Sequence, residues 1–419
     1  MVSKVKFEEL AINGGPKVRT TPMPGRGLLG EEERAAVNSL FDRAIESGNA
    51  FGYNGPEEEA YCKEFAEFMD GGYVDAVNSG TTAVYVALRA LDLEPFTEVI
   101  VSPITDPGGV MPVAMINCIP VVADAMPFSY NTGPEEIEKL ISPLTSAILI
   151  GHIAGEPLDI EGIVEIAKKH NIPVVEDCAQ AHGAKINGKL VGSFGDIAAF
   201  STMFGKHHCT GGQGGLVYTS SEELYWRARQ ASDRGKPFGL PQGSTNCVAS
   251  LNYNLNDLQA AIGRVQLAKL PKIVENRRAV VEKIRAGLKD LKSVFIPEQI
   301  EGVEPSYWFL RIQVAVDKIS CDKETYCRSL AAEGIPINPR YDAFPHEKDW
   351  FKNRRVFGTS GYPWNSPKYK GDPNREFPCP NAHEAVSVQF NLSIHESWGD
   401  EEIDDTLRAF RKLEGAYLK

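Results

Sequence analysis

The residue that most clearly suggests chemistry in this sequence is Lys206. It follows the apolar segment Ile197–Ser201, and four glycines stand just beyond it between positions 211 and 215. Closely packed backbone in such a loop would exclude water from the amine, and desolvation favours the neutral form of a lysine. A neutral amine attacks carbonyl carbon, so this placement predicts a Schiff-base lysine, although most single lysines are only solvated surface charges.

An acid is expected in a buried position nearby. The β-branched run that begins at Val174 ends in two acids, Glu176 and Asp177. A buried carboxylate is costly unless it meets a cation or several hydrogen-bond donors. Asp177 is therefore either the partner of a cationic ligand or an ordinary helix cap or strand-end ion pair, and the sequence leaves both open.

Two further segments could bind phosphate groups. Asn78-Ser79-Gly80-Thr81-Thr82 directly precedes a helical pattern, where glycine allows a close approach and the first free amides of the helix attract anions. An Asn-rich loop at 251–256 leads into an Ala-rich helix and could supply a second clamp. Both segments also fit plain helix caps.

No metal site is predicted. Cys178 and His182 are four residues apart and could share a helix face, but the sequence offers no two further ligands at suitable spacing. His207, His208 and Cys209 are adjacent, and three adjacent side chains do not easily converge on one ion.

A phosphate cradle, an acid and a lysine, in this order on one sheet, are what a pyridoxal phosphate site requires. The lysine forms an imine with the cofactor, and the acid keeps the pyridine nitrogen protonated so that the ring can take up carbanion charge. An ionised Asp177 would raise the pKa of that nitrogen by favouring its charged form. The sequence therefore predicts pyridoxal phosphate as the cofactor.

The elements that must position these residues follow an α/β pattern. Strand-like runs alternate with segments of helical spacing, which predicts a mostly parallel sheet with helices on both faces. Ligands of such sheets lie at the carboxyl ends of the strands. The predicted strands are 99–102, 119–123, 147–151, 173–176, 197–201 and 215–219, and the predicted helices among them are 81–91, 134–141 and 160–170.

Three regions are expected along the chain. Residues 1–30 are rich in Gly and Pro and are predicted to form an extended arm. Residues 31–268 form the predicted large domain, and residues 269–419 a smaller α/β C-terminal domain. The smaller domain is predicted from a charged helix at 270–291, an apolar run at 308–316, helices at 322–333 and 400–413, and a Pro-rich irregular stretch at 336–380.

Composition excludes several classes of protein. The formal net charge of -12 and a pI near 5.3 argue against a nucleic-acid or anionic-membrane partner. The eight cysteines include no CxxC pair, no run of 18 apolar residues occurs, and residues 1–10 lack an apolar leader core. We therefore expect a cytoplasmic protein with reduced thiols and no membrane segment.

The chain resembles the DegT/DnrJ/EryC1/StrS aminotransferases, a family of fold-type I pyridoxal-phosphate enzymes that act on sugar nucleotides and aminocyclitols. The resemblance extends over nearly the whole length, with the motifs in the family's order. They are LAINGGPKVR at 10–19, NSGTTA at 78–83, HIAGEPLDI at 152–160, EDCAQAHGA at 176–184, GSFGDIAAFS…GK at 192–206 and NYNLNDLQAAIG at 252–263.

The resemblance implies a role for each residue. Lys206 forms the internal aldimine and then acts as general acid and base, and Asp177 binds the pyridine nitrogen. Gln180 binds the ring hydroxyl. Gly80, Thr81 and Ser201 hold the phosphate, joined by Asn252 from the partner subunit of a homodimer. The implied reaction converts a keto group of a sugar nucleotide or an aminocyclitol precursor into an amine, with glutamate or glutamine as donor.

Three positions depart from the family's pattern. Asp106 stands in the segment 102–111, where the family has an aromatic residue stacked on the cofactor ring. Asn254 replaces an arginine in the interface loop, and Gln213 replaces an acid before the last two glycines. The loops that recognise the substrate are expected at 102–112, 232–256 and 336–380.

Other functions remain open from the sequence. The family's dehydratase branch has histidine in place of the lysine, so Lys206 favours transamination. A pyridoxal-phosphate-binding regulator without turnover is compatible with the three departures. A Rossmann-type oxidoreductase is disfavoured, because no GxGxxG motif follows a strand.

Overall fold

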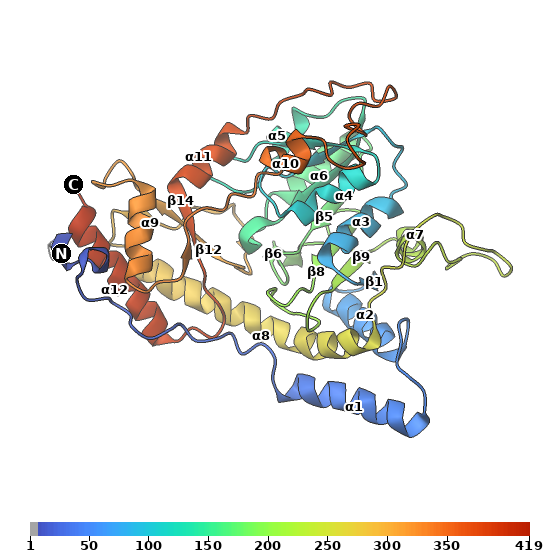
Figure 1. Ribbon diagram of the computed structural model, residues 1–419, viewed down its shortest axis with the longest axis horizontal. Coiled ribbons are helices and arrows are strands. Elements are labelled where there is room, and N and C mark those ends of the chain that lie inside the picture. The colour runs from blue at the N-terminus through green and yellow to red at the C-terminus, as the bar shows by residue number, and fades with distance from the viewer. Residues whose placement is uncertain (1–6) are drawn as a thin grey trace.

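A computed structural model describes residues 7–419, and its centre is a seven-stranded sheet of order β1-β9-β8-β5-β4-β2-β3 (Figure 1). All neighbours pair in parallel except β9, which is antiparallel to both β8 and β1. The predicted mostly parallel sheet is therefore confirmed. Its strands are β1 (Tyr73–Val77), β2 (Glu98–Val101), β3 (Ile119–Val122), β4 (Thr145–Gly151), β5 (Val174–Asp177), β8 (Ile197–Ser201) and β9 (Gly215–Thr219).

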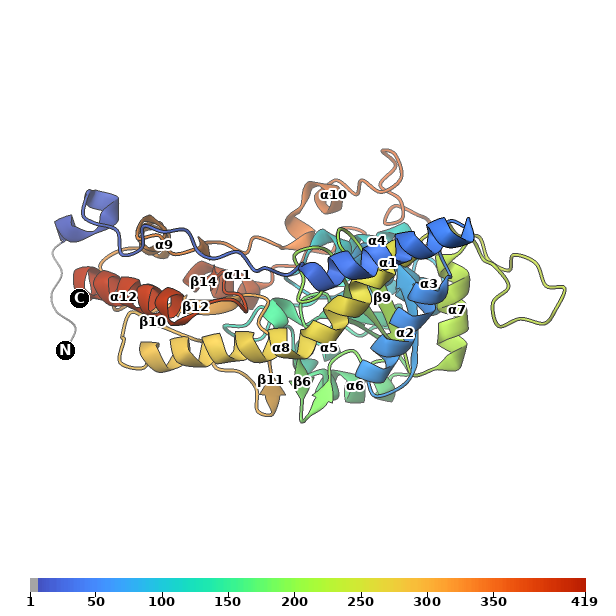
Figure 2. The same cartoon turned by 90° about the horizontal axis from the view of Figure 1, so that it is seen from below.

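Alternate residues of each strand enter cores on opposite faces of the sheet, as the two-residue repeat of a strand requires. Val99 and Val175 face one core, whereas Ile100 and Val174 face another. Helices cover both faces (Figures 1 and 2). They are α1 (Glu31–Ser47), α2 (Pro56–Phe68), α3 (Gly80–Ala90), α4 (Met111–Met115), α5 (Pro134–Glu138), α6 (Ile160–Lys169) and α7 (Glu222–Ser232).

Side-chain caps set where several helices begin. Each capping side chain accepts a hydrogen bond from a backbone amide of the first turn, because the α-helix itself offers these amides no acceptor. The capping residues are Ser79 for α3, Asp159 for α6, Ser221 for α7, Asn256 for α8 (Asp257–Leu288) and Asp322 for α9 (Lys323–Ala332).

A second, antiparallel sheet of order β10-β12-β14-β13 has its own core, which includes Ile312, Phe390 and Phe410. Its strands are β10 (Val294–Phe295), β12 (Leu310–Val314), β13 (Ile337–Asn338) and β14 (Gln389–Leu392). The remaining helices are α8 (Asp257–Leu288), α9 (Lys323–Ala332), α10 (Asp349–Lys352), α11 (Pro380–Val388) and α12 (Asp400–Tyr417). A small sheet joins β6 (Lys185–Ile186), β7 (Lys189–Leu190) and β11 (Val303–Glu304).

Helix α8 connects the two cores without a break (Figure 1). Leu267 near its start packs beneath the large sheet, and Ile284 near its end packs in the smaller core. The predicted domain boundary at 268/269 falls inside this helix and stays a prediction. The Pro-rich stretch contributes Phe344, Phe351 and Trp364 to the core of the large sheet.

Residues 7–30 of the predicted N-terminal arm run along the smaller core toward the large sheet (Figure 2), and residues 1–6 lie outside the described part of the chain. Arg19 forms ion pairs with Glu402 and Asp405 of α12. Arg26 pairs with Glu396 and donates hydrogen bonds to the carbonyl oxygens of Gly205 and Lys206. The arm therefore fixes the backbone of the loop that carries Lys206.

The sequence predicted six strands of the large sheet within one or two residues at each end, namely β2, β3, β4, β5, β8 and β9. It missed β1 and the two-residue strands β6 and β7. Helix α8 also begins earlier than the predicted helix at 270, because the Ala-rich segment after Asp257 is helical. In residues 7–419 no helix combines the length and the apolarity needed to cross a membrane.

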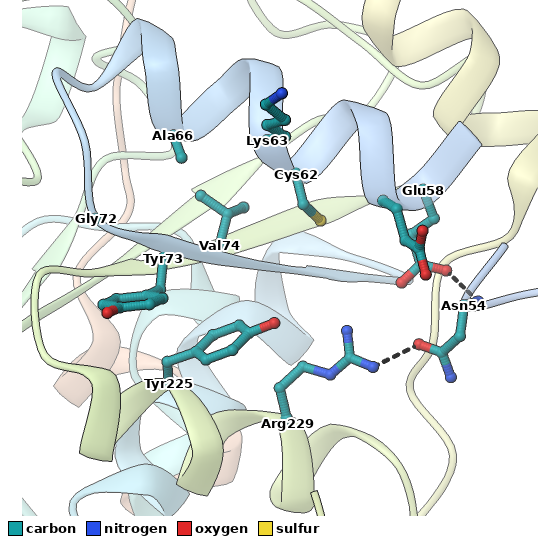
Figure 3. Close-up of a pocket in the computed structure, with 11 residues that line it drawn as sticks. Asn54, Glu58, Cys62, Lys63, Ala66, Gly72, Tyr73, Val74, Tyr225 and Arg229 are labelled. Carbon is teal, nitrogen blue, oxygen red and sulfur yellow. Dashed lines mark hydrogen bonds between the residues drawn. The ribbon is translucent and has the colours of Figure 1, made fainter. Parts of the chain in front are cut away.

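A cavity of about 300 Å³ lies between α2, β1 and α7, beside the strand that leads into the NSGTT segment (Figure 3). Glu58 and Asp75 are both about 2% exposed here, and Arg229 lies 3.4 Å from Asp75. Burial raises the pKa of Glu58 to about 8, and the nearby Asp75 adds to the shift. Glu58 is therefore held in its protonated form near neutral pH.

Replacing Glu58 by Gln should stabilise the protein at alkaline pH. Between about pH 5 and pH 8 the unfolded chain releases the Glu58 proton while the folded chain keeps it, so this residue lowers stability as pH rises. We expect Glu58→Gln to raise the free energy of unfolding by on the order of 1–3 kcal/mol at pH 8.5 and to change it little at pH 5. Denaturant titrations at both pH values check this, with exposed Glu59→Gln as the control; equal effects at both pH values would contradict it.

Candidate active site

The carboxyl ends of β4, β5 and β8 and the first turn of α3 enclose a cavity of about 240 Å³. This is where ligands bind in open α/β sheets. Six residues singled out from the sequence line it together: Gly80, Thr81, Asp177, Gln180, Ser201 and Lys206. Residues more than 120 positions apart in the chain thus meet in one space, as expected if all belong to one site.

The turn before α3 forms a narrow cradle. Ser79 caps the helix by accepting a hydrogen bond from the amide of Thr82 (3.1 Å), so the plain capping role considered from the sequence is real. Gly80 begins the helix, and a Cβ at this position would lie only 2.5 Å from the Cβ of Ser201. Glycine is therefore required for the turn to approach Ser201, and the amides of Gly80 and Thr81 are left without intrahelical acceptors.

Asp177 is the last residue of β5. Its Oδ1 accepts a hydrogen bond from the amide of Ala179 (3.0 Å), and a Cβ on Gly109 would lie 2.8 Å from its Oδ2. Burial raises the pKa of Asp177, while the Ala179 amide and the charge of Lys206 oppose that rise. The carboxylate thus has few donors of its own and is stabilised by a cation in the cavity.

Lys206 is 7% exposed, and its Nζ lies 3.9 Å from the centre of the Trp308 ring. Burial lowers the pKa of Lys206 to about 8, although Asp177 and Asp106 act in the opposite direction. A substantial fraction of the amine is therefore neutral near pH 8. A buried amine with such a pKa can attack a carbonyl and can also carry a proton, and the Schiff-base role of Lys206 stays a prediction.

Glu176, next to Asp177, is a structural anchor. Burial opposes its ionisation, yet a hydrogen bond from His152 and backbone amides of Gly195 and Gly192 outweigh burial and lower the pKa of Glu176. His152 Nδ1 accepts a hydrogen bond from the Leu158 amide, so its Nε2 carries the proton donated to Glu176 (3.0 Å). The fully bonded carboxylate fixes the end of β5 and thereby the position of Asp177.

Gln180 joins the cavity to the Pro-rich stretch. Its Oε1 accepts a hydrogen bond from the Ala154 amide, and its Nε2 donates to the Tyr341 hydroxyl oxygen (both 2.9 Å). Thr105, which also lines the cavity, donates from its amide to the carbonyl oxygen of Ala343. The segment around Tyr341 is therefore bonded to two residues that line the cavity, although it comes from the C-terminal part of the chain.

Asn252 does not line this cavity. It is exposed, and its Oδ1 accepts hydrogen bonds from the amide and the side chain of Asn254. Within one chain, Asn252 therefore makes no contribution to the cradle, and its predicted role in a partner's site stays a prediction.

The structure shows the contacts of the three residues that depart from the family pattern. Asp106 caps the short turn Pro107–Gly109 by accepting a hydrogen bond from the Gly108 amide, and it borders the cavity together with Gln213. Asn254 donates to Asn252. Among the described residues that line the cavity, His152 carries the only aromatic ring.

The neighbouring histidines have other partners than a shared ion. His182 donates to the Ser201 carbonyl oxygen (2.8 Å), His207 donates to that of Ser306 (3.1 Å), and His208 bonds the Tyr61 hydroxyl (2.7 Å). Burial lowers the pKa of each of these three imidazoles, so they are neutral packing groups.

Comparison with known proteins identifies the family. The model of the DegT/DnrJ/EryC1/StrS aminotransferase family matches residues 30–411. The chain belongs to this family. The protein is therefore an aminotransferase, and its α/β fold is that of a solved aminotransferase.

Three relatives illustrate the range of this family. An L-glutamine:2-deoxy-scyllo-inosose aminotransferase of Micromonospora echinospora is 30% identical, covering 96% of this chain and 97% of the relative. A dTDP-3-amino-3,4,6-trideoxy-alpha-D-glucose transaminase of Streptomyces venezuelae is 33% identical over 67% and 72%. A dTDP-4-dehydro-2,6-dideoxy-D-glucose 3-dehydratase of Saccharopolyspora spinosa is 31% identical over 71% and 70%.

The fold is similar to that of solved aminotransferases. The crystal structure of an aminotransferase from Psychrobacter cryohalolentis superposes with a TM-score of 0.80 at 28% identity, covering 93% of this chain and 98% of that one. The predicted fold-type I architecture is therefore confirmed.

Sequence reasoning missed three residues near the reactive groups: His152, Trp308 and Tyr341. His152 directly follows β4, and Asp177 is the last residue of the neighbouring β5, so the place of His152 at a strand end was a usable signal. Trp308 and Tyr341 lie outside the strand–helix alternation. No spacing in the sequence connects them to the large sheet.

Replacing Trp308 by Leu should lower the pKa of Lys206 further below its present value of about 8. The indole face stabilises the ammonium form by about 1–2 kcal/mol in a desolvated site, which corresponds to a shift of about one pH unit. Borohydride trapping of a small aldehyde on Lys206, followed by mass spectrometry across a pH series, measures the pH at which labelling of this amine is half-maximal. Trp308→Phe should shift it less, and an unchanged midpoint in the Leu variant would refute the cation–π contribution.

Proposed function

We propose that this protein is a pyridoxal-phosphate-dependent aminotransferase that converts a keto group of a sugar nucleotide or an aminocyclitol precursor into an amine, with glutamate or glutamine as the donor. The observation that carries the proposal is the buried amine of Lys206, whose pKa is about 8, in a cavity that also contains the carboxyl group of Asp177. Family membership supports the same reaction class.

The cavity fits the cofactor chemically. The cradle formed by Gly80, Thr81 and Ser201 combines free amides, hydroxyl groups and a helix N-terminus, which together suit a phosphate group. The Asp177 carboxyl suits a protonated ring nitrogen, because a cation offsets its desolvation. Pyridoxal phosphate, when bound, supplies an aldehyde that condenses with amines and a ring that takes up electron pairs.

Each protein group then has a definite task. Lys206 Nζ holds and moves a proton, because a pKa near the working pH makes both protonation states accessible. Asp177 keeps a cation fixed at the end of β5, and Glu176 and His152 keep Asp177 in place. Gln180, held by Ala154 and Tyr341, presents its amide group at the cavity wall, where the ring hydroxyl is proposed to lie.

The substrate class rests on the relatives. The relative that covers nearly the whole chain is named for L-glutamine and 2-deoxy-scyllo-inosose, a cyclitol ketone, and others are named for dTDP-linked sugars. We place the cyclitol or sugar ketone at the turn 105–109, which lines the cavity and is hydrogen-bonded to the segment around Tyr341.

A homodimer with shared active sites is part of the proposal. Phe204, two residues from Lys206, and Leu251, next to Asn252, are 67% and 65% exposed. A second copy that covers these apolar side chains would bring the partner's Asn252 toward the cradle, with a two-fold arrangement repeating the contact. The cytoplasmic location remains a prediction from the sequence.

Two alternatives are distinguished by this site. A sugar dehydratase is favoured by one relative's name, but position 206 is a lysine, whereas the dehydratase branch has histidine. A regulator without turnover would keep the cradle and lose donor-dependent chemistry. Asp106, which replaces the aromatic residue, is the feature that favours such a regulator.

The cofactor-loaded protein should convert pyridoxal phosphate to pyridoxamine phosphate when glutamine or glutamate is added alone. Absorbance spectra and chromatography of the released cofactor follow this half-reaction. Lys206→Ala should abolish it and also abolish borohydride trapping of the cofactor, because the attacking amine is absent. Lys169→Ala, an exposed lysine on α6, is the matched control. Cofactor binding with no conversion by any amino donor would favour the regulator.

Asp177→Asn should slow the half-reaction by two orders of magnitude or more, since a neutral amide does not stabilise a cation at that position. The amide can still accept the hydrogen bond from Ala179, so folding should be retained. Single-turnover rates, together with thermal midpoints, separate the two effects. A near-normal rate in a folded variant would mean that the cation has another partner.

A further inference from the structure

A cluster of metal-ligand side chains lies in the C-terminal part of the chain, outside the candidate active site. His346 and Glu347 belong to the short turn Pro345–Glu347, and His383 belongs to the first turns of α11. One potential ligand atom from each of the three lies within 4.8 Å of the others. His383 Nε2 and Glu347 Oε1 are 3.2 Å apart.

The surroundings hold these side chains in position. The Phe344 ring stacks on His383 with a centroid distance of 4.4 Å and an interplanar angle of 21°. Asp124 accepts hydrogen bonds from the amides of Asn381 and Ala382, which fixes the start of α11. His346 has a buried Nδ1 without a hydrogen-bond partner among the described residues. Two imidazoles and a carboxylate are thus preplaced from two separate segments.

A second group of possible ligands, His152, Glu176 and Cys178, differs in a decisive way. The oxygens of Glu176 already accept hydrogen bonds from three backbone amides and from His152, and the group is fully buried. An ion there would have to displace these donors. In the cluster at 346, 347 and 383, the side chains of His383 and Glu347 are 43% and 37% exposed, so an ion can enter from solvent.

We propose that His346, Glu347 and His383 bind a divalent transition-metal ion, with Zn²⁺ as the best-matched occupant. Two imidazole nitrogens and one carboxylate oxygen form a ligand set typical of zinc, and water completes a four-coordinate shell. Imidazole ligands disfavour Mg²⁺ and Ca²⁺, which prefer an all-oxygen shell. The sequence did not reveal this site, because 35 residues lie between Glu347 and His383 without a recognisable spacing.

The ion would connect α11 to the segment that is hydrogen-bonded to two residues of the cavity lining. The turn with His346 follows directly after Tyr341 and Ala343, which contact Gln180 and Thr105. Cross-linking this turn to α11 restricts the segment in the folded state, and binding to the folded state alone stabilises it. The role assigned to the metal is therefore structural, and it does not depend on the proposed reaction.

The test uses the full chain, free of affinity tags, after treatment with a chelator. Equilibrium dialysis against Zn²⁺ with elemental analysis should find about one saturable ion per chain at micromolar or lower free zinc. Excess Mg²⁺ should not compete. Saturating Zn²⁺ should raise the thermal midpoint by a few degrees.

Variants assign the site. His383→Gln and Glu347→Gln change partly exposed side chains and should each weaken zinc binding at least tenfold and remove the thermal shift. His170→Gln, at the exposed end of α6, is the control and should bind zinc as the unmodified protein does. Lys206→Ala should also bind zinc normally, which separates this proposal from the proposed function. No saturable binding, or unchanged binding in both site variants, would overturn it.

Discussion

The architecture around the candidate active site is governed by one constraint, the burial of the Lys206 amine together with the Asp177 carboxyl group. Neither group is stable in its charged form without compensation, and burial shifts the pKa of Lys206 down and that of Asp177 up. The Trp308 ring and the mutual attraction of the two groups offset part of that cost. The N-terminal arm and the Glu176 anchor both hold these two groups in the cavity: Arg26 of the arm binds the backbone of the Lys206 loop, and Glu176 fixes the end of β5 that carries Asp177.

The sheet solves the positioning problem through strand order. Strands β4, β5 and β8 are neighbours and parallel, so His152, Asp177 and the loop with Lys206 emerge at the same edge. The antiparallel strand β9 lies between β8 and β1, and it begins beside the cradle at the start of α3. Adjacent acids on β5 take different roles: Glu176 is saturated with donors and rigid, whereas Asp177 is left short of donors and needs a cation.

The C-terminal part of the chain completes the site. Trp308 covers the amine, Arg277 and Arg26 meet at Glu396 beneath the Lys206 loop, and Tyr341 holds Gln180. The Pro-rich segment packs its aromatic side chains into the core of the large sheet. A zinc ion between that segment and α11 would add a cross-link where regular secondary structure is sparse, because the turn at 345–347 and α10 are both very short.

The sequence by itself determined six of the seven strands of the large sheet and three of the helices between them, because strand and helix periodicities are local. It singled out the six cavity residues from their places at strand ends and helix starts together with the family's motifs. It also determined the family. Only the tertiary structure decided that β1 completes the sheet and that α8 spans both cores. It also decided that Trp308 and Tyr341 contact cavity residues and that His346 and His383 lie near each other. These contacts join segments that have no common period or spacing, so their proximity depends on how the two cores pack rather than on any local pattern.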